Sequence, residues 1–441
     1  MSRPSELPSV LPREPVDRLI EPFARFLRVG AAGGAVLLAA AAVALVAANS
    51  PAAGAWRALW STELSFEVGG FRLAHSLAHW VSDGLMTVFF FVIGLEVKRE
   101  VVSGQLRDLR VAALPIAAAV GGMLAPAGVY LGFQWGEPGA RGWGIPMATD
   151  IAFAIGCLAV LGPRVPASLR VLLVSLAIAD DIGAILVIAI GYADAIHLGW
   201  LALGGAGMLL VQTLSLLGVR SVPIYAIAGF PMWLGFHESG VHATIAGVIL
   251  GLMTPHRSWI GAAALREAVQ RADGFLHGEA DSEQQRAVLG ELGLAAREAV
   301  SPLERLEHAL HPWQSFAIVP LFALANAGVA VSPGAFADPI ATAVAVALVA
   351  GKPIGIFAAS WLAVRTGVAR LPADLSWPMV IGAGCLGGIG FTMSIFIAGL
   401  AFEDPALAAA KLGILAGSLV SGILGLSLLA RVLPRRGEAG A

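Results

Sequence analysis

The feature that most constrains this chain is an apolar run that holds two adjacent aspartates. Residues 171–192 read VLLVSLAIADDIGAILVIAIGY, with Asp180 and Asp181 near the middle. At roughly 1.5 Å per residue, a helix over this run crosses a hydrocarbon core about 30 Å thick. One aspartate at the centre of such a helix costs about 2.5–3.5 kcal/mol on insertion scales, so packing alone does not account for two.

The aspartate pair predicts a site for protons or for a cation. Adjacent helical residues point about 100° apart, so the two carboxylates can serve different partners. Two neighbouring carboxylates in a low dielectric cannot both ionise unless a cation lies nearby. The alternative is a structural polar contact between helices.

The composition indicates a polytopic membrane protein. Of the 441 residues, 57% are hydrophobic and 13% are charged, against about 25% charged residues in soluble domains. The mean hydropathy is +0.80. A net charge of −2 gives no electrostatic basis for nucleic-acid binding, and two cysteines, both inside apolar runs, are too few for a disulfide framework.

We predict an all-α transmembrane domain over residues 29–431, between cytoplasmic tails at 1–28 and 432–441. Residues 255–312 form a long polar segment, predicted to be a cytoplasmic loop with short amphipathic helices at the membrane surface. About twelve spans are expected, at residues 29–48, 75–97, 111–133, 143–161, 169–192, 198–218, 222–236, 240–254, 313–331, 339–363, 376–400 and 407–431.

The basic residues predict the orientation of these spans. Twenty-three Lys and Arg residues fall on the side that holds both tails and the long loop. The opposite side holds four, and Lys352 lies within a span. Because cytoplasmic segments carry the excess of basic residues, both termini are expected in the cytoplasm.

Between the first two spans, the segment LSFEVGGFRLAH alternates apolar and polar residues around Gly69 and Gly70. This pattern predicts a β-hairpin on the outer face. An isolated hairpin is marginally stable, so we interpret residues 65–73 as a contact in a dimer. An ordinary loop fits the same residues equally well.

Two interrupted spans, the fourth and the eleventh, resemble each other. TDIAFAIG at 149–156 and TMSIFIAG at 392–399 align, and each follows a helix-breaking run, GWGIP or GAGCLGGIG. Corresponding interrupted spans are typical of transporter sites, where exposed backbone groups bind ions or are compensated by charged side chains. The alternative is a chance match in a chain rich in Gly and Ala.

Four ionisable residues lie deep within predicted spans: Asp150, Asp180, Asp181 and Lys352. A buried ammonium group needs a carboxylate, and the aspartate pair can supply one. The other aspartate is then left for an exchangeable Na+ or Li+, which prefer hard oxygen ligands. The spans lack the His and Cys spacing of a metal enzyme, and no nucleotide-binding motif has the right context, so neither an enzyme nor ATP-driven transport is expected.

Other charged residues lie near the ends of spans. Asp83 and Glu96, at opposite ends of the second span, fit vestibules or simple interfacial charges. Glu307, His308 and His311 cluster before the ninth span, where histidines titrating near neutral pH suit a cytoplasmic pH sensor. A solvated helix end explains this cluster equally well.

Taken together, these stretches resemble the NhaA family of bacterial sodium/proton antiporters. The resemblance covers about residues 28–430 and rests on HWVSDGLMTVFFFVIGLEVKRE, ATDIAFAIG, SLAIADDIGAI, SGVHATIAGV, RLEHALHPW, FALANAG, AGKPIGI and GIGFTMSIFIAGLAF. It implies inverted-topology repeats with two crossed, interrupted helices. It also implies a homodimer in the bacterial inner membrane that needs no cofactor and expels Na+ or Li+ by using the proton gradient.

The resemblance further implies residue roles. Asp180 and Asp181 would bind the ion, with Asp181 as the direct sodium ligand, and Lys352 would pair with Asp180. Thr149 and Asp150 would compensate the ends of the crossed helices, and Asp83 would lie on the outer path. The residues implied in a cytoplasmic pH response are Glu96, Lys98, Arg99, Glu100, Glu307, His308 and His311.

Two points qualify these roles. Ser82 stands before Asp83, where the family more often has Asn. The loop at about residues 257–301 is longer than is usual in the family, and Glu304 occupies a position that is often basic, which weakens the inferred pH response. A sodium-coupled solute symporter of inverted-repeat fold is the alternative function, although the spans offer no Arg to anchor an organic solute at the midplane.

Overall fold

The structure is a computed structural model that describes residues 32–68, 71–192, 196–219, 221–276, 282–331 and 334–434. The predicted tail at 1–28 lies outside the described residues, as do residues 435–441 of the second tail and the turn at Gly69 and Gly70.

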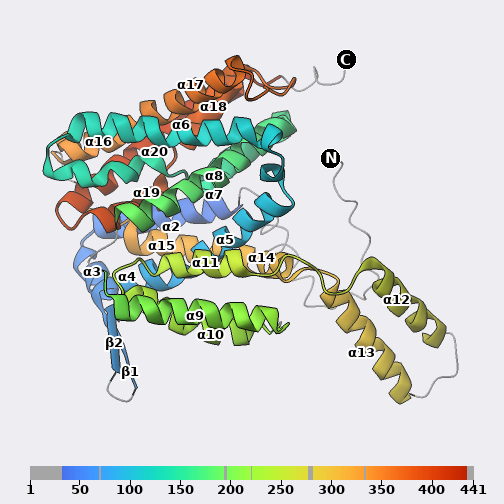
Figure 1. The fold of residues 1–441 in the computed structure, drawn as a ribbon. Coiled ribbons are helices and arrows are strands. Elements are labelled where there is room, and N and C mark those ends of the chain that lie inside the picture. Colours follow the sequence, from blue (N-terminus) through green and yellow to red (C-terminus); the bar gives the residue numbers. More distant parts are fainter. Residues whose placement is uncertain are drawn as a thin grey trace.

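The described chain is predominantly helical, with one small hairpin near its start (Figure 1). The elements up to the first long helices are α2 (Ala32–Ala48), α3 (Ala53–Ser61), β1 (Glu63–Val68), β2 (Phe71–Ser76), α4 (Leu77–His79), a π-helical turn (Trp80–Leu85), α5 (Met86–Val102), a 3-10 turn (Gln105–Arg107) and α6 (Leu109–Gln134).

The middle of the chain contains the first interrupted span and the helix with the aspartate pair. Its elements are a 3-10 segment (Pro138–Met147), α7 (Ile151–Leu161), a 3-10 turn (Gly162–Arg164), α8 (Ala167–Gly191), α9 (Leu198–Leu216), α10 (Val222–Glu238), α11 (Thr244–Met253), α12 (Ala262–Leu276), α13 (Ser282–Glu298) and α14 (Pro302–Trp313).

The last part contains the helix with Lys352 and the second interrupted span. Its elements are a π-helical turn (Gln314–Ile318), α15 (Val319–Asn326), a 3-10 turn (Ala335–Ala337), α16 (Pro339–Val346), a π-helical turn (Ala347–Gly351), α17 (Lys352–Arg365), α18 (Trp377–Gly387), α19 (Phe391–Ala401) and α20 (Ala406–Val432).

Six helices of the described chain are long and apolar enough to cross a membrane, and counting three bent pairs as single spans gives up to nine. The predicted ranges agree with the corresponding helices to within a few residues. The total of twelve stays a prediction, because α10 and α11 have only 17 and 10 residues and α14 has an amphipathic sequence.

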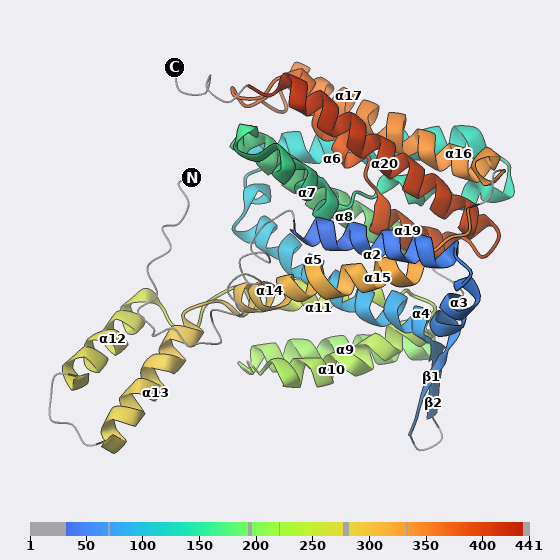
Figure 2. The same cartoon turned by 180° about the vertical axis from the view of Figure 1, so that it is seen from behind.

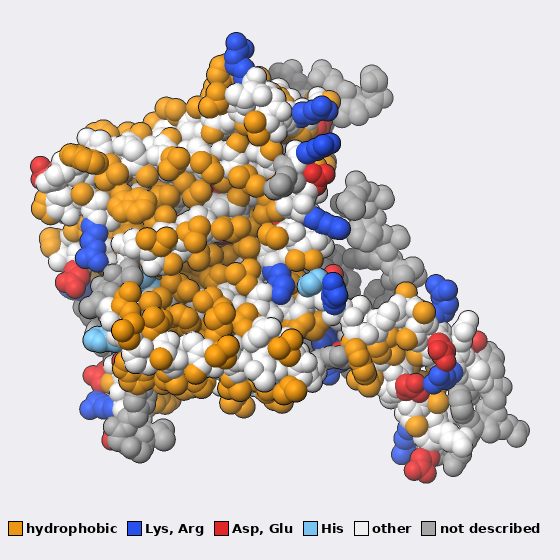
Figure 3. Space-filling view, in the orientation of Figure 1, with side chains coloured by type: hydrophobic (Ala, Val, Ile, Leu, Met, Phe, Trp, Pro, Cys, Tyr) orange, Lys and Arg blue, Asp and Glu red, His pale blue; other side chains and the backbone are white. Residues whose placement is uncertain are grey.

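The surface of the helical body is suited to lipid. Hydrophobic side chains cover most of the face in Figure 3, and charged side chains gather toward its two side margins and on the α12–α13 arm. Leu124, Ile190 and Leu209 are each at least 66% exposed. An apolar surface of this extent is unfavourable in water, so it indicates contact with hydrocarbon.

The predicted hairpin is confirmed, with strands longer than expected. β1 and β2 pair antiparallel from Glu63 opposite Ser76 to Val68 opposite Phe71. The hairpin projects from one end of the helical body, and α12 and α13 project as an arm from the other end (Figures 1 and 2). The amphipathic helices expected in the long loop are therefore present, but they extend away from the body.

Glycines allow the helices around the aspartate pair to pack closely. A Cβ atom at Gly355 in α17 would lie 2.1 Å from the carbonyl oxygen of Gly121 in α6. A side chain at either residue would push these helices apart. Their close approach places Lys352, at the start of α17, inside the protein rather than at its surface.

Candidate functional site

The two interrupted spans meet at their breaks. The segment Pro138–Met147 and α7 differ in direction by 43°, and α18 and α19 differ by 47°. The backbone N–H of Asp150 donates to the carbonyl of Ile389 at 2.7 Å, which joins one break to the other. Helix-breaking residues in both spans therefore place two sets of free helix ends side by side within the protein.

Asp150 satisfies the first turns of both half-helices. Its Oδ1 accepts a hydrogen bond from the N–H of Phe153 in α7 at 3.1 Å. Its Oδ2 accepts from the N–H of Thr392 in α19 at 3.2 Å and from the Thr392 hydroxyl at 2.5 Å. Helix N-termini carry unpaired N–H groups and a partial positive charge, so one buried carboxylate stabilises both.

Asp180 is fully buried and forms an ion pair with Lys352, which is also fully buried. The Lys352 Nζ atom lies 2.5 Å from Asp180 Oδ2 and also donates to the carbonyl of Met147. Asp180 Oδ1, by contrast, has no hydrogen-bond partner among the described residues. One half of this carboxylate is therefore neutralised, and the other half is left open to a further ligand.

Thr149 connects the ion pair to the second break. Its hydroxyl lies 2.6 Å from Asp180 Oδ2 and 2.9 Å from the carbonyl oxygen of Gly387. A hydroxyl has one proton to donate, so it serves one of these acceptors fully at a time. Loss or gain of charge at Asp180 can thus be transmitted to the α18–α19 break through Thr149.

Asp181 points to a different environment from its neighbour. It lines a cavity of about 290 Å³ together with Glu96, Asp150, His311 and Thr392. A water molecule takes about 30 Å³ of liquid volume, so the cavity has room for a small cation with part of its water shell. The adjacent aspartates therefore have different surroundings: Asp180 faces an ammonium group, and Asp181 faces a cavity.

A second cavity, of about 470 Å³, lies further along α19. Thr392 and Met393 line the first cavity, whereas Ile395 and Phe396 line the second, and the two cavities share no lining residue. Asp83 lines the second cavity, so the predicted outer-path residue and Asp181 open to different cavities.

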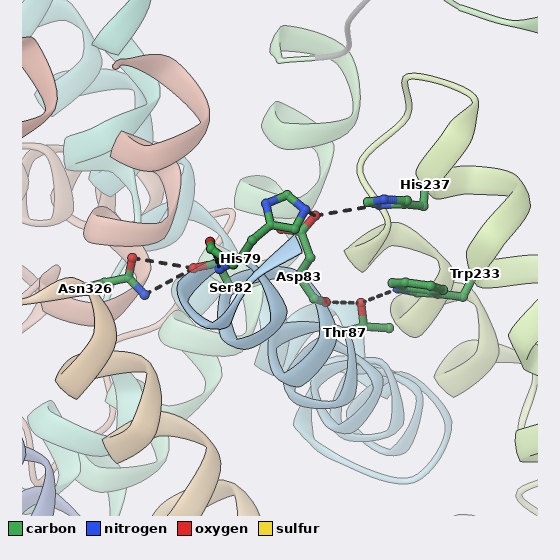
Figure 4. Close-up of polar contacts among 8 residues, drawn as sticks. His79, Ser82, Asp83, Thr87, Trp233, His237 and Asn326 are labelled. Atoms are coloured by element: carbon green, nitrogen blue, oxygen red, sulfur yellow. Dashed lines mark hydrogen bonds and ion pairs between the residues drawn. The ribbon is translucent and has the colours of Figure 1, made fainter. Parts of the chain in front are cut away.

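The environment of Asp83 is shown in Figure 4. Its carboxylate points toward His237, and its backbone carbonyl accepts from the Thr87 hydroxyl at 2.6 Å. Thr87 in turn accepts from the Trp233 indole N–H at 3.0 Å. The preceding residue, Ser82, accepts a hydrogen bond from the side-chain amide of Asn326 at 3.1 Å. Ser82 occupies the position where the family more often has Asn, and here the asparagine comes from another helix.

The residues expected in a pH response fall into three groups. Glu96 and His311 line the same cavity as Asp181. Arg99 forms an ion pair with Glu307, and a second, 3.7 Å long, with Glu100. Lys98 instead donates to the carbonyl of Leu252 at 2.7 Å, and His308 is exposed on α14.

Sequence reasoning did not identify the histidines around Asp83. His75 and His79 precede Asp83 at intervals of four residues, a spacing that was visible in the sequence. The third, His237, comes from α10, more than 150 residues later, and only the fold brings it to the others.

A polytopic fold in which two interrupted helices enclose a buried ion pair and a second carboxylate defines a secondary transporter. Comparison with known proteins places the chain within this class. A model of the family described as Na+/H+ antiporter 1 matches residues 24–429, and the chain belongs to that family.

Similar proteins include the Na(+)/H(+) antiporter NhaA of Rhodopirellula baltica, which is 54% identical over 96% of this chain and 97% of that protein. The Na(+)/H(+) antiporter NhaA of Rhizobium meliloti is 52% identical over 96% of this chain and 97% of its own length. The Na(+)/H(+) antiporter NhaA 2 of Acidiphilium cryptum is 51% identical, over 96% and 95%.

The ion pair predicts a large effect on stability. Lys352→Met leaves the charge of Asp180 buried without its partner, and breaking a buried pair in this way typically costs about 3–5 kcal/mol. We expect the thermal midpoint of the purified protein in detergent to fall clearly. The double variant Lys352→Met/Asp180→Asn should recover most of the loss, and Arg107→Met, which removes an exposed guanidinium, should have little effect. Equal midpoints for Lys352→Met and the unchanged chain would contradict the pairing.

The Arg99–Glu307 contact predicts a pH effect. Burial raises the pKa of Glu307, whereas the neighbouring Arg99 guanidinium lowers it. Arg99→Gln should therefore raise this pKa further. A carboxyl group with a raised pKa in the folded state contributes stability that is present below its ordinary pKa and is lost as the pH rises through the folded value.

We therefore expect the thermal midpoint of Arg99→Gln to fall more steeply than that of the unchanged chain as the pH rises from 4.5, the ordinary pKa of a glutamate side chain, toward neutrality. Adding Glu307→Gln should remove the extra slope. If Arg99→Gln left the pH dependence of the thermal midpoint unchanged, the Arg99 guanidinium would not influence the pKa of Glu307.

Proposed function

We propose that this chain exchanges Na+ or Li+ for protons across a membrane, and that Asp180 and Asp181 form the site at which the ions compete. The proposal rests on the different surroundings of the two aspartates. Asp180 is held by Lys352, with one oxygen free, while Asp181 lines an accessible cavity beside it. Carboxylate and backbone oxygens with water are suitable ligands for an alkali cation.

Exchange follows from competition for the same oxygen atoms. Sodium entering the cavity from the cytoplasm displaces protons from the aspartates, because a protonated carboxyl group is a poor cation ligand. After the loaded site reorients, external protons displace sodium toward the outer path, where Asp83 lines the second cavity. An unoccupied, ionised pair is costly in a low dielectric, so each turn of the cycle carries one ion or the other.

The open cavity supports an inward-facing arrangement. It contains Asp181 together with Glu96 and His311, which the predicted topology places toward the cytoplasm. The second cavity, which contains Asp83, reaches α19 further along its length, at Ile395 and Phe396. Because α19 begins at a break held by Asp150 and Thr392, movement of this half-helix is a direct means of transferring access from one cavity to the other.

Lys352 is a candidate source of a second proton. Its ammonium is neutralised by Asp180, and a cation that binds the free Asp180 oxygen competes with that neutralisation. Release of the Lys352 proton would restore the charge balance. The cycle would then move more than one proton for each sodium ion and would be electrogenic.

The proposal includes regulation by pH on the cytoplasmic side. Its residues are Glu96, Lys98, Arg99, Glu100, Glu307, His308 and His311. Support comes from their position, because Glu96 and His311 share the cavity of Asp181 and the Arg99–Glu307 ion pair lies nearby on α5 and α14.

The architecture proposed for this function is that of twelve spans with inverted-topology repeats and crossed half-helices in a bacterial inner membrane. Both termini would lie in the cytoplasm, and no cofactor is required. The contact between the two breaks and the placement of the hairpin and the α12–α13 arm at opposite ends of the body support it.

The central prediction concerns Asp181. In proteoliposomes that report internal pH, Asp181→Asn should abolish proton movement driven by Na+ or Li+, since an amide can neither release a proton nor balance the cation. Glu137→Gln, which changes an exposed carboxyl group, should retain it. Retained exchange in Asp181→Asn would refute the assigned role. Proton movement that required an added organic solute would instead indicate a symporter.

A homodimer is proposed through the hairpin. Leu64 and Phe66 are 43% and 56% exposed on a two-stranded sheet that projects from the body. Such a sheet is marginally stable by itself and gains from pairing with a second copy.

Crosslinking tests this contact. Both natural cysteines are buried, so a single exposed cysteine can be introduced as Ser65→Cys and treated with a short bis-maleimide. We expect a covalent dimer in native membranes from this variant and little from Glu137→Cys. Equal crosslinking of the two variants would speak against the hairpin as the dimer contact.

A further inference from the structure

Three histidines meet at the mouth of the second cavity, outside the aspartate pair. They are His75 on β2, His79 at the end of α4 and His237 on α10, and one ring nitrogen from each lies within 4.8 Å of the others. The Oδ2 atom of Asp83 is 3.3 Å from His79 Nε2 and 3.7 Å from His237 Nδ1. Four potential metal ligands therefore converge from two separate parts of the chain.

The fold holds these rings in place. The His75 and His79 rings stack with centroids 4.2 Å apart, and the His237 ring stands edge-on to His75 at 5.3 Å. On its other side, His237 stacks on Trp233 at 5.1 Å with an interplanar angle of 8°. The close-up in Figure 4 shows His79 beside Asp83, with His237 reaching toward them from α10.

The cluster has an unused ligand atom. His79 Nε2 is buried and makes no hydrogen bond, although Asp83 Oδ2 lies 3.3 Å away. Buried polar atoms without partners are rare and call for a ligand or another explanation.

The types of ligand atom in the cluster indicate which metal ions it suits. Three imidazoles and one carboxylate suit a borderline cation such as Zn2+, whereas Na+, Mg2+ and Ca2+ prefer oxygen ligands alone. Tetrahedral zinc with Zn–N distances of about 2.0–2.1 Å places its ligand atoms about 3.4 Å apart. The three nitrogens, now within 4.8 Å of one another, would have to reach that spacing by side-chain rotation when the metal binds.

We propose that His75, His79 and His237, with Asp83 as fourth ligand, form a binding site for Zn2+ or a similar transition-metal ion at the mouth of the outer cavity. The bound ion would tie the hairpin and α10 to the start of the Asp83 helix. It would also place a divalent charge beside Asp83, on the outer path. External metal should therefore slow exchange, and this consequence, unlike the site itself, rests on the proposed function.

Metal binding is tested directly, without transport. The purified chain, free of any polyhistidine tag, is equilibrated with Zn2+ in detergent, and bound metal is measured by equilibrium dialysis. Co2+ provides a second readout, because tetrahedral coordination gives a strong visible spectrum. We expect one such site for each chain, and affinity reduced about tenfold or more in His75→Gln and in His237→Gln.

Matched variants separate ligand loss from misfolding. His197→Gln removes an exposed histidine outside the cluster and should bind metal as the unchanged chain does. His75→Cys, which supplies another zinc ligand, should retain binding. The proposal would be overturned if the unchanged chain bound no metal at this site, or if His75→Gln and His237→Gln bound it as tightly as the unchanged chain does.

The effect on transport is measured in proteoliposomes by adding Zn2+ outside. Exchange by the unchanged chain should slow, and exchange by His75→Gln should not. Metal binding without any slowing would overturn the proposed effect on the outer path. Metal binding in a chain that shows no sodium/proton exchange would leave the metal site standing and remove the proposed function instead.

Discussion

The structure depends on the need to neutralise every charge and every free helix end that lies inside it. Asp180 and Lys352 satisfy this requirement as a pair, and Asp150 satisfies it for the first turns of α7 and α19. These groups are not independent, because Thr149 contacts Asp180 and Gly387 at once. Through Thr149, a change of charge at the Asp180–Lys352 pair can therefore alter the hydrogen bonding at Gly387, in the break between α18 and α19.

That coupling gives a physical basis for transport. The ion pair leaves one Asp180 oxygen without a partner among the described residues and leaves Asp181 beside a cavity. Under the proposed function, protons or a cation would complete this site. The half-helix α19 lines both this cavity and, further along its length, the one around Asp83. Under the proposed mechanism, movement of this one segment would alter both cavities. The histidines above Asp83 would add a metal-dependent restraint at the outer cavity.

Much of this could be predicted from the sequence. The interruptions before Ile151 and Phe391, the apolar spans, the hairpin and the helices of the long loop all carry local signals, either breaks in hydrophobic periodicity or alternation. The pairing of Lys352 with an aspartate also followed, since a buried ammonium needs a carboxylate. Only the family resemblance implied that Lys352 pairs with Asp180 rather than with Asp181. The two aspartates point in different directions from their helix, and the sequence does not show which of them faces the helix that carries Lys352.

The sequence by itself determined the chemistry: which charges lie in apolar spans, and where the backbone must break. Such properties depend on residues near one another in the chain. Tertiary structure alone decided the placement of Asp181 in one cavity and Asp83 in another, the double role of Asp150, and the meeting of His237 with His75 and His79. These depend on contacts between helices far apart in the chain, which local periodicity does not encode.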